Sequence, residues 1–206
     1  MPQYTRNPPL DIPDLDPDPL KQLDKWLADA REAGMIDPTA MALGTATPDG
    51  RPSVRIVLFK GFQHGGLSFY THLLSRKGLE LEMNPFVAAT FWWDRLERQV
   101  RVEGRVSRLP ETVARDYFQS RPRESQLSAY TSRQSQVVGS REALDARMRD
   151  NAQKFEGQAI PFPDSWGGYS LEPESFEFWQ GRLGRTHDRL SYRRCVKAWK
   201  IERLEP

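Results

Sequence analysis

The feature that most constrains the fold is a change in hydrophobic period near residue 40. Before it, Leu20, Leu23, Trp26, Leu27 and Ala30 recur at the spacing of one helix face. After it, apolar and polar residues alternate in short segments, a pattern typical of half-buried strands. The strands predominate, and the helical segments do not alternate regularly with them. The sequence therefore predicts a mainly antiparallel β-barrel with added helices, not a doubly wound sheet.

Local signals set the expected elements. Asp18 and Pro19 suit the start of the first helix and Gly34 its end. A hairpin turns at Thr47–Gly50, where proline presets φ and glycine tolerates a positive φ. The predicted strands cover residues 40–46, 53–60, 66–71, 86–93, 97–109, 168–171, 175–180, 190–194 and 198–204, and further helices cover 75–83, 110–119, 125–130 and 140–155.

The length of 206 residues favours one folded domain, which we place at residues 18–206. Residues 1–17 are rich in proline and aspartate and show no period, so we expect a flexible arm or an extended wrap over a partner. In the strand at 97–109, Val100, Val102 and Val106 share one face. Phe91, Trp92 and Trp93 either fill a barrel or form part of a protein interface.

Composition excludes several classes of protein. Thirty basic residues against 28 acidic ones give a net charge of +2, too balanced for general nucleic-acid binding. The apolar runs are too short to cross a membrane, and no secretory signal is visible. One cysteine, Cys195, rules out an internal disulfide and points to a reducing, cytoplasmic setting. With only three histidines beside it, we expect no metal site. Phosphate-loop, dinucleotide and nucleophile-elbow motifs are missing.

Cationic and hydroxyl residues gather in a few places. Of the 30 basic residues 23 are arginine, which reflects either codon usage or bidentate recognition of phosphates. Ser75, Arg76 and Lys77 open a helix, where free N–H groups and the helix dipole favour an anion. The alternative is a solvated first turn. Arg55 and Lys60 bracket one strand.

Three further segments carry chemistry-bearing side chains, each with an ordinary structural alternative. A phenol, two guanidinium groups and a hydroxyl lie together at Tyr117, Arg121, Arg123 and Ser125. Gln134-Ser135 lies in a polar segment that is equally consistent with an ordinary loop. Arg185, His187 and Arg189 alternate, so an extended segment would place all three on one face.

At these residues the sequence resembles the pyridoxamine 5′-phosphate oxidase family. The resemblance covers most of the chain, from about residue 18 to the end, and its blocks follow the family's order. The blocks are Arg55–Lys60, Tyr70-Thr71, Ser75–Lys77, Glu97–Gln99, Ser120–Gln126, Arg133–Ser135 and Phe176–Gln180 with Arg185–Arg189.

The resemblance implies an FMN-binding split β-barrel and a homodimer with FMN in clefts between the subunits. It implies FMN contacts from Arg55, Ile56, Val57, Leu58, Lys60, Tyr70, Thr71, Arg76, Lys77, Gln99, Gln134, Ser135, Trp179 and Arg189. It further implies that the phosphate of the substrate meets Lys60, Tyr117, Arg121 and Ser125, with Arg185 and His187 over the pyridine ring as the catalytic pair. Two phosphate groups need two cationic cradles, and the clusters above supply two.

The implied reaction is oxidation of pyridoxamine 5′-phosphate or pyridoxine 5′-phosphate to pyridoxal 5′-phosphate. A hydride passes from C4′ to flavin N5, and O₂ reoxidises the flavin to give hydrogen peroxide. Our hypothesis is that Arg185 and His187 position the C4′ substituent and assist removal of its proton.

Two alternatives stay open: a split-barrel flavin oxidase of another substrate, as in the phenazine pathway, and a protein that binds FMN or pyridoxal phosphate without turnover. Two positions depart from the family pattern. Thr186 stands where an aliphatic residue is usual, and Met1–Tyr4 lacks the arginines of the family's N-terminal stretch, although Arg6 lies near.

Overall fold

The computed structural model describes residue 4, residues 6–196 and residues 198–206. Its elements, in chain order, are α1 (Pro19–Glu32), β1 (Ala40–Ala46), β2 (Pro52–Leu58), β3 (Phe62–Gln63), β4 (Gly66–His72), α2 (Arg76–Met83), β5 (Phe86–Trp93), β6 (Arg98–Arg108), α3 (Glu111–Ser120), α4 (Arg123–Thr131), α5 (Arg141–Lys154), β7 (Trp166–Gln180), β8 (Asp188–Arg194) and β9 (Trp199–Arg203). Single 3-10 turns occur at Ile12–Asp14, Asp94–Leu96 and Leu183–Arg185.

The strands form one antiparallel sheet in the order β2-β1-β5-β6-β7-β4-β3, with β8 and β9 added beside β7. Just after β2, the N–H of Lys60 donates to the carbonyl of Ser68 on β4 at 2.8 Å. The sheet therefore curls until its first strand returns to β4. This confirms the predicted mainly antiparallel fold with added helices.

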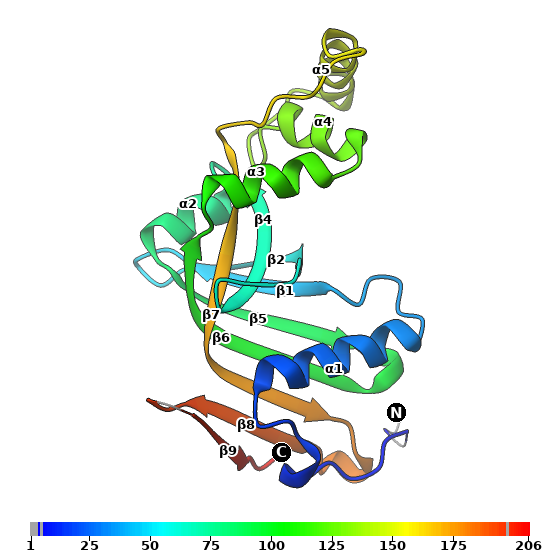
Figure 1. Cartoon of the computed structure of the whole chain (residues 1–206), viewed down its shortest axis with the longest axis vertical. Helices are drawn as coiled ribbons and strands as arrows, with labels where there is room; N and C mark the ends of the chain where they lie inside the picture. Colours follow the sequence, from blue (N-terminus) through cyan, green and yellow to red (C-terminus); the bar gives the residue numbers. More distant parts are fainter. Residues whose placement is uncertain (1–3, 5, 197) are drawn as a thin grey trace.

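The core lies between the curled sheet and α1, which crosses it in Figure 1. The helix buries the predicted stripe, and the ring of Trp26 meets that of Phe178 edge-on at 5.2 Å. Val100, Val102 and Val106 share one face, as predicted, and that face points inward. The aromatic run on β5 divides: Phe91 and Trp93 fill the interior, whereas Trp92 on the opposite face keeps 46% of its surface exposed.

The strand β7 corrects the sequence prediction. Residues 168–171 and 175–180, expected as two strands, belong to one strand of 15 residues. The pairing with β6 shifts register between Glu103 and Gly104, so that Glu174 is an extra residue on β7. Pro173, which has no N–H, lies opposite Gly104 at this bulge. The sequence shows the proline as an interruption, but the strand continues through it. The two-residue β3 was not predicted.

The helices α3, α4 and α5 gather at one end of the molecule, next to the start of β7 (Figure 1). They share a small core of Phe118, Phe155, Ile160 and Trp166 with the start of β7. All three were predicted, although α4 begins two residues earlier than expected. This group of helices forms a wall beside β4.

Part of the expected N-terminal arm packs against the body of the protein. Leu10 and Leu15 are buried in the core. The N–H of Leu10 donates to Oδ2 of Asp188 at 3.0 Å, and Arg203 donates to the Leu10 carbonyl at 2.6 Å. These bonds join the beginning of the chain to β8 and β9. Within the described part of the chain, no helix is both long and apolar enough to span a bilayer.

The bulge predicts a strict requirement for glycine at position 104. A Cβ there would lie 2.1 Å from the carbonyl oxygen of Glu172, and backbone would have to move. We expect Gly104→Ala to lower the free energy of unfolding by about 1–3 kcal/mol in urea denaturation. Gly139→Ala is the control, since no atom lies within 4 Å of the added methyl. Equal stability of the two variants would contradict this account of the bulge.

Candidate functional site

A cavity of about 290 Å³ lies where β2 and β4 meet α2, α3 and α4. Its walls come from segments up to 110 residues apart in sequence. It is lined by Ile56, Val57, Leu58, Lys60, Tyr70, Thr71, His72, Lys77, Tyr117, Arg121, Ser128, Ala129, Ser132, Gln134 and Trp166. Ten of these residues were predicted to contact FMN or substrate phosphate, so the fold brings most of the predicted set together.

One wall of the cavity is an aromatic stack. The ring of Tyr70 stacks on Tyr117 with centroids 4.0 Å apart and lies nearly parallel to Trp166 at 5.4 Å. The guanidinium of Arg121 lies over Trp166 at 5.0 Å. Burial raises the pKa of both tyrosines, so their hydroxyls stay protonated at neutral pH.

Two buried nitrogens in this cavity have no hydrogen-bond partner among the described residues. They are Nη1 of Arg121 and Nδ1 of His72. An unpaired buried polar group is costly, and one that carries a positive charge is more so. Arg121 therefore indicates an anion as the partner that this part of the cavity is built to take.

The other end of the cavity is the start of α2. Ser75 caps the helix, its hydroxyl accepting from the N–H of Gly78. Lys77 points Nζ to Oγ1 of Thr71 at 3.0 Å and to Oε1 of Gln134 at 2.8 Å. The backbone N–H of Arg76 donates to Oγ of Ser135 at 3.1 Å. The polar 134–135 segment is thus tied to the helix N-terminus.

Lys77 is 8% exposed, and its ammonium is hydrogen-bonded to neutral side chains. Burial, together with the positive charge of Arg55, lowers the pKa of Lys77 to about 8, although the Glu80 carboxylate opposes the shift. A cation held at a helix N-terminus opposes the helix dipole. The arrangement is therefore suited to an anion that would neutralise the ammonium and complement the positive end of the helix dipole.

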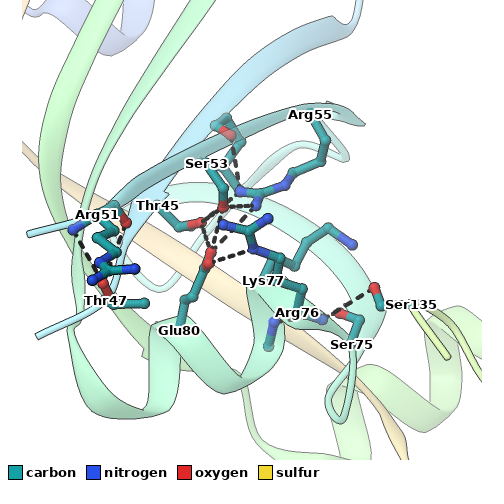
Figure 2. A network of polar contacts seen from close by, with 12 residues as sticks. Thr45, Thr47, Arg51, Ser53, Arg55, Ser75, Arg76, Lys77, Glu80 and Ser135 are labelled. Carbon is teal, nitrogen blue, oxygen red and sulfur yellow. Dashed lines mark hydrogen bonds and ion pairs between the residues drawn. The ribbon is translucent and has the colours of Figure 1, made fainter.

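Arg55 and Arg76 lie beside this cavity and meet at a residue that the sequence analysis missed. Figure 2 shows both side chains directed to Glu80, which is 3% exposed. Arg76 Nε donates to Glu80 Oε1 at 2.9 Å, and Arg55 Nη2 lies 3.3 Å from Oε2. The four-residue spacing of Arg76 and Glu80 was the available signal.

A second group of predicted residues, which are Gln99, Trp179, Arg185, His187 and Arg189, lies toward the far end of β7. Trp179 pairs with Gln99 on β6 and with Arg189 on β8. The His187 ring lies 4.6 Å from Trp179, and Tyr4 meets both rings edge-on at 5.5 and 5.6 Å. Glu177 accepts from Arg189 at 2.8 and 3.1 Å, which raises the pKa of the guanidinium. Of the arm residues compared with the family stretch, Met1–Gln3 lie outside the described residues.

The geometry predicted for the 185–189 segment is wrong in one respect. Gly184 and Arg185 have φ values of +66° and +64° and belong to a 3-10 turn. Side-chain alternation therefore does not apply to Arg185, and β8 begins only at Asp188. In the loop, Nδ1 of His187 accepts from the backbone N–H of Arg182 at 3.2 Å. Burial and the charge of Arg185 lower the pKa of His187, which keeps the ring neutral near pH 7.

The two groups do not meet within one chain. Trp166, in the cavity, and Trp179, in the second group, are thirteen residues apart on β7, roughly 40 Å along an extended strand. Figure 1 shows β8 at the opposite end of the molecule from α3 and α4. Ser125 lies on α4 but does not line the cavity, where Ser128 and Ser132 do.

Several cavity residues were not predicted, namely His72, Ser128, Ala129, Ser132 and Trp166. Ser128 on α4 and Ser132 at its C-cap are four residues apart, which is a signal only once this helix is known to face the cavity. Among the described residues, no group of three or more histidine, cysteine, aspartate or glutamate side chains could hold a metal ion.

Comparison with known proteins agrees with this arrangement. The sequence model of the pyridoxamine 5′-phosphate oxidase family matches residues 27–154. The model of the pyridoxine 5′-phosphate oxidase C-terminal dimerisation region matches residues 166–206. A protein of Rubrobacter xylanophilus named pyridoxine/pyridoxamine 5′-phosphate oxidase is 52% identical over 93% of this chain and 88% of its own length. Its namesake in Acaryochloris marina is 49% identical over 91% and 86%.

Solved structures agree in fold. PhzG from Burkholderia lata, crystallised with tetrahydrophenazine-1-carboxylic acid, superposes with a TM-score of 0.89 at 34% identity, covering 94% of this chain and 95% of that one. An FMN-binding protein from Nostoc punctiforme related to pyridoxamine 5′-phosphate oxidase superposes at 0.73, with 17% identity over 93% of this chain and all of that one. The split-barrel fold is thus shared, and the sequence matches show that the chain belongs to the pyridoxamine 5′-phosphate oxidase family.

Proposed function

We propose that this protein is an FMN-dependent oxidase that converts pyridoxamine 5′-phosphate or pyridoxine 5′-phosphate to pyridoxal 5′-phosphate. The family and the names of relatives about 50% identical support an oxidoreductase of this kind. The observation that carries the proposal is one cavity lined by separate cationic groups. Arg121 packs on the aromatic stack, Lys77 lies at the start of α2, and Lys60 also lines the cavity. Such a cavity suits two phosphate esters.

The cavity residues fit the phosphate tail of FMN. Lys77 supplies a buried charge, and the start of α2 adds the positive end of the helix dipole. Gln134 and Ser135, already tied to Lys77 and Arg76, would close over the tail. When bound, FMN would accept two electrons from the substrate carbon and pass them to O₂, which yields hydrogen peroxide.

The substrate phosphate would bind at the aromatic stack. Arg121 brings an unpaired buried Nη1, and Tyr117 brings a hydroxyl that burial keeps protonated. Lys60 adds a second cation to the lining of the cavity. The guanidinium packed on Trp166 is held in place before the ligand arrives, which reduces the entropy lost on binding.

His187 and Arg185 would act on the reacting end of the substrate. The main-chain N–H of Arg182 occupies Nδ1 of His187, so the neutral ring carries its proton on Nε2. His187 is therefore suited to donate a hydrogen bond to the substrate and to orient it. This supports the positioning part of our hypothesis over the proton-removal part.

We further propose that the complete site forms between two copies of the chain. The cavity and the Trp179 group lie at opposite ends of β7, too far apart along one strand for a single FMN. A two-fold dimer would bring the Trp179 group of one subunit to the cavity of the other. The match of residues 166–206 to a dimerisation region supports this assembly, because that segment carries Trp179, His187 and Arg189.

A second candidate is oxidation of a reduced phenazine, favoured by the likeness to PhzG. Such a substrate carries no phosphate ester and would leave Arg121 unpaired in the cavity. The presence of Lys60, Tyr117 and Arg121 together therefore favours the vitamin B6 phosphates. The third candidate, binding without turnover, differs from both in that no substrate would release peroxide, which the first experiment below measures.

We expect the purified protein to bind FMN and, under air, to release peroxide in step with pyridoxal 5′-phosphate when given pyridoxamine 5′-phosphate. Arg121→Met should raise the KM for this substrate about tenfold to a hundredfold, because a charged hydrogen bond is lost. Arg141→Met, a change at an exposed arginine on α5, is the control. Peroxide only from a reduced phenazine, or FMN binding without any peroxide, would refute the proposal.

The lowered pKa of Lys77 predicts how FMN affinity depends on pH. Below a pKa of about 8 the lysine is already charged, and above it a proton must be taken up as the phosphate binds. The Kd for FMN should therefore rise above pH 8, by up to about tenfold per pH unit. Fluorescence titrations between pH 7 and 9.5 measure this. Lys77→Met should bind FMN weakly with no such rise, and a rise that persists in it would assign the effect elsewhere.

A shared site predicts complementation between two inactive variants. Lys77→Met damages the cavity, and His187→Ala damages the second group. Unfolded together and refolded at equal amounts, they should regain about one quarter of wild-type activity, since half the dimers are mixed and each mixed dimer has one intact site. Each variant refolded alone is the control. No recovery from mixtures that contain verified mixed dimers would place the whole site within one chain.

A further inference from the structure

A buried carboxylate lies inside a group of cations that is proposed to receive a phosphate. Glu80 is on the inner face of α2, and only 3% of it is exposed. Around it lie Arg55, Arg76 and Lys77, which together carry three positive charges. A negative charge there weakens the attraction for an anion, so its presence calls for a physical reason.

The contacts of Glu80 supply that reason. Oε1 accepts from Nε of Arg76 at 2.9 Å. Oε2 accepts from the hydroxyl of Ser53 at 2.6 Å and from that of Thr45, and it lies 3.3 Å from Nη2 of Arg55. Figure 2 shows these side chains converging from the β1–β2 hairpin and from α2. The carboxylate therefore fixes two arginines that come from different elements.

The two arginines are held in different ways. Arg55 uses both terminal nitrogens within the protein: Nη1 donates to the Leu43 carbonyl and to Thr45, and Nη2 donates to Ser53 and Glu80. Arg76 is bound through Nε alone, and its side chain is 62% exposed. Within the described part of the chain, no hydrogen bond engages its two terminal nitrogens. Those are the nitrogens with which a guanidinium grips a phosphate.

The charge state of Glu80 is compatible with this arrangement at all physiological pH values. Burial raises the pKa of Glu80, but the hydrogen bonds from Ser53, Thr45 and Arg76 and the charge of Arg55 outweigh it and bring the pKa down to about 2. The carboxylate also offsets the repulsion between the two guanidinium groups. An arginine fixed in advance loses less side-chain entropy when it binds a ligand.

We propose that Glu80 is a positioning residue that gives this site its selectivity for a flavin with a terminal phosphate over the same flavin without one. It acts through Arg76, which it holds by Nε so that the terminal nitrogens are left for the phosphate. The proposal rests on the proposed function, which places the FMN phosphate at the start of α2.

The competing explanation is purely structural. Glu80 also joins α2 to the β1–β2 hairpin, and loss of that link would loosen the whole cavity. A structural role would weaken binding of every flavin alike. A positioning role would weaken binding of the phosphorylated flavin alone, because only the phosphate uses Arg76.

The test is to titrate the full-length protein, stripped of flavin, with FMN and with riboflavin, following flavin fluorescence. Glu80→Gln keeps the shape of the side chain and removes its charge. We expect its Kd for FMN to rise about tenfold while the Kd for riboflavin stays within twofold of wild type. Glu82→Gln, an exposed change on the same helix, should leave both constants unchanged.

A double-mutant cycle with Arg76→Gln keeps the test decisive if Glu80→Gln also lowers stability. Arg76→Gln should reduce the selectivity for FMN, and adding Glu80→Gln should reduce it no further. Equal losses for FMN and riboflavin in Glu80→Gln, an additive double variant, or tighter FMN binding after loss of the carboxylate would each overturn the proposal. A wild-type protein that does not distinguish the two flavins would instead refute the placement of the FMN phosphate.

Discussion

The rest of the structure depends on the continuous pairing of β7. This strand pairs with β6 along its length, with β4 at its first half and with β8 at its second. It therefore supports the cavity at one end and the Trp179 group at the other. A strand with partners on both sides has no free edge and resists bending, except where Glu174 is inserted opposite Gly104. The bulge therefore allows one strand to pair with β4 before the bend and with β8 after it.

The chemistry at the start of α2 follows from an excess of positive charge that other groups of the protein do not fully neutralise. Arg76 and Lys77 bring positive charge to the end of a helix that already carries a positive partial charge. Glu80 and Gln134 reduce this excess without removing it, because one carboxylate faces three cations and an amide oxygen has no charge. A protein that keeps such an imbalance is prepared for an anion. At the aromatic stack, the buried Nη1 of Arg121 is likewise positively charged and has no hydrogen-bond partner among the described residues.

Much of the fold could be predicted from sequence, because alternation and helix caps are local signals. Asp18, Pro19 and Gly34 mark α1 closely, and the inward face of β6 follows from its valines. The continuity of β7 could not be predicted, because Pro173 is typical of a strand end. Only the pairing with Gly104 on β6 shows that the strand continues through it. The predicted site residues separate likewise. The resemblance named them as one set, but only the three-dimensional arrangement divides them into a cavity and a distant second group. Glu80 was missed because an arginine four residues earlier is equally typical of an exposed ion pair on a helix. The hydroxyls that donate to its carboxylate come from a hairpin distant in sequence.

The join between the two ends of the chain has a consequence for topology. Asp188 accepts from the backbone of Leu10 and from Arg203, and Arg203 donates in turn to the Leu10 carbonyl across 193 positions of sequence. Segments near the two ends of the chain are therefore hydrogen-bonded to each other beside the His187 loop. A circular permutant that links these two segments covalently and opens the chain in the exposed loop at Val137 would keep every strand pairing of the sheet. A peptide link would then replace the hydrogen bonds that join the two segments.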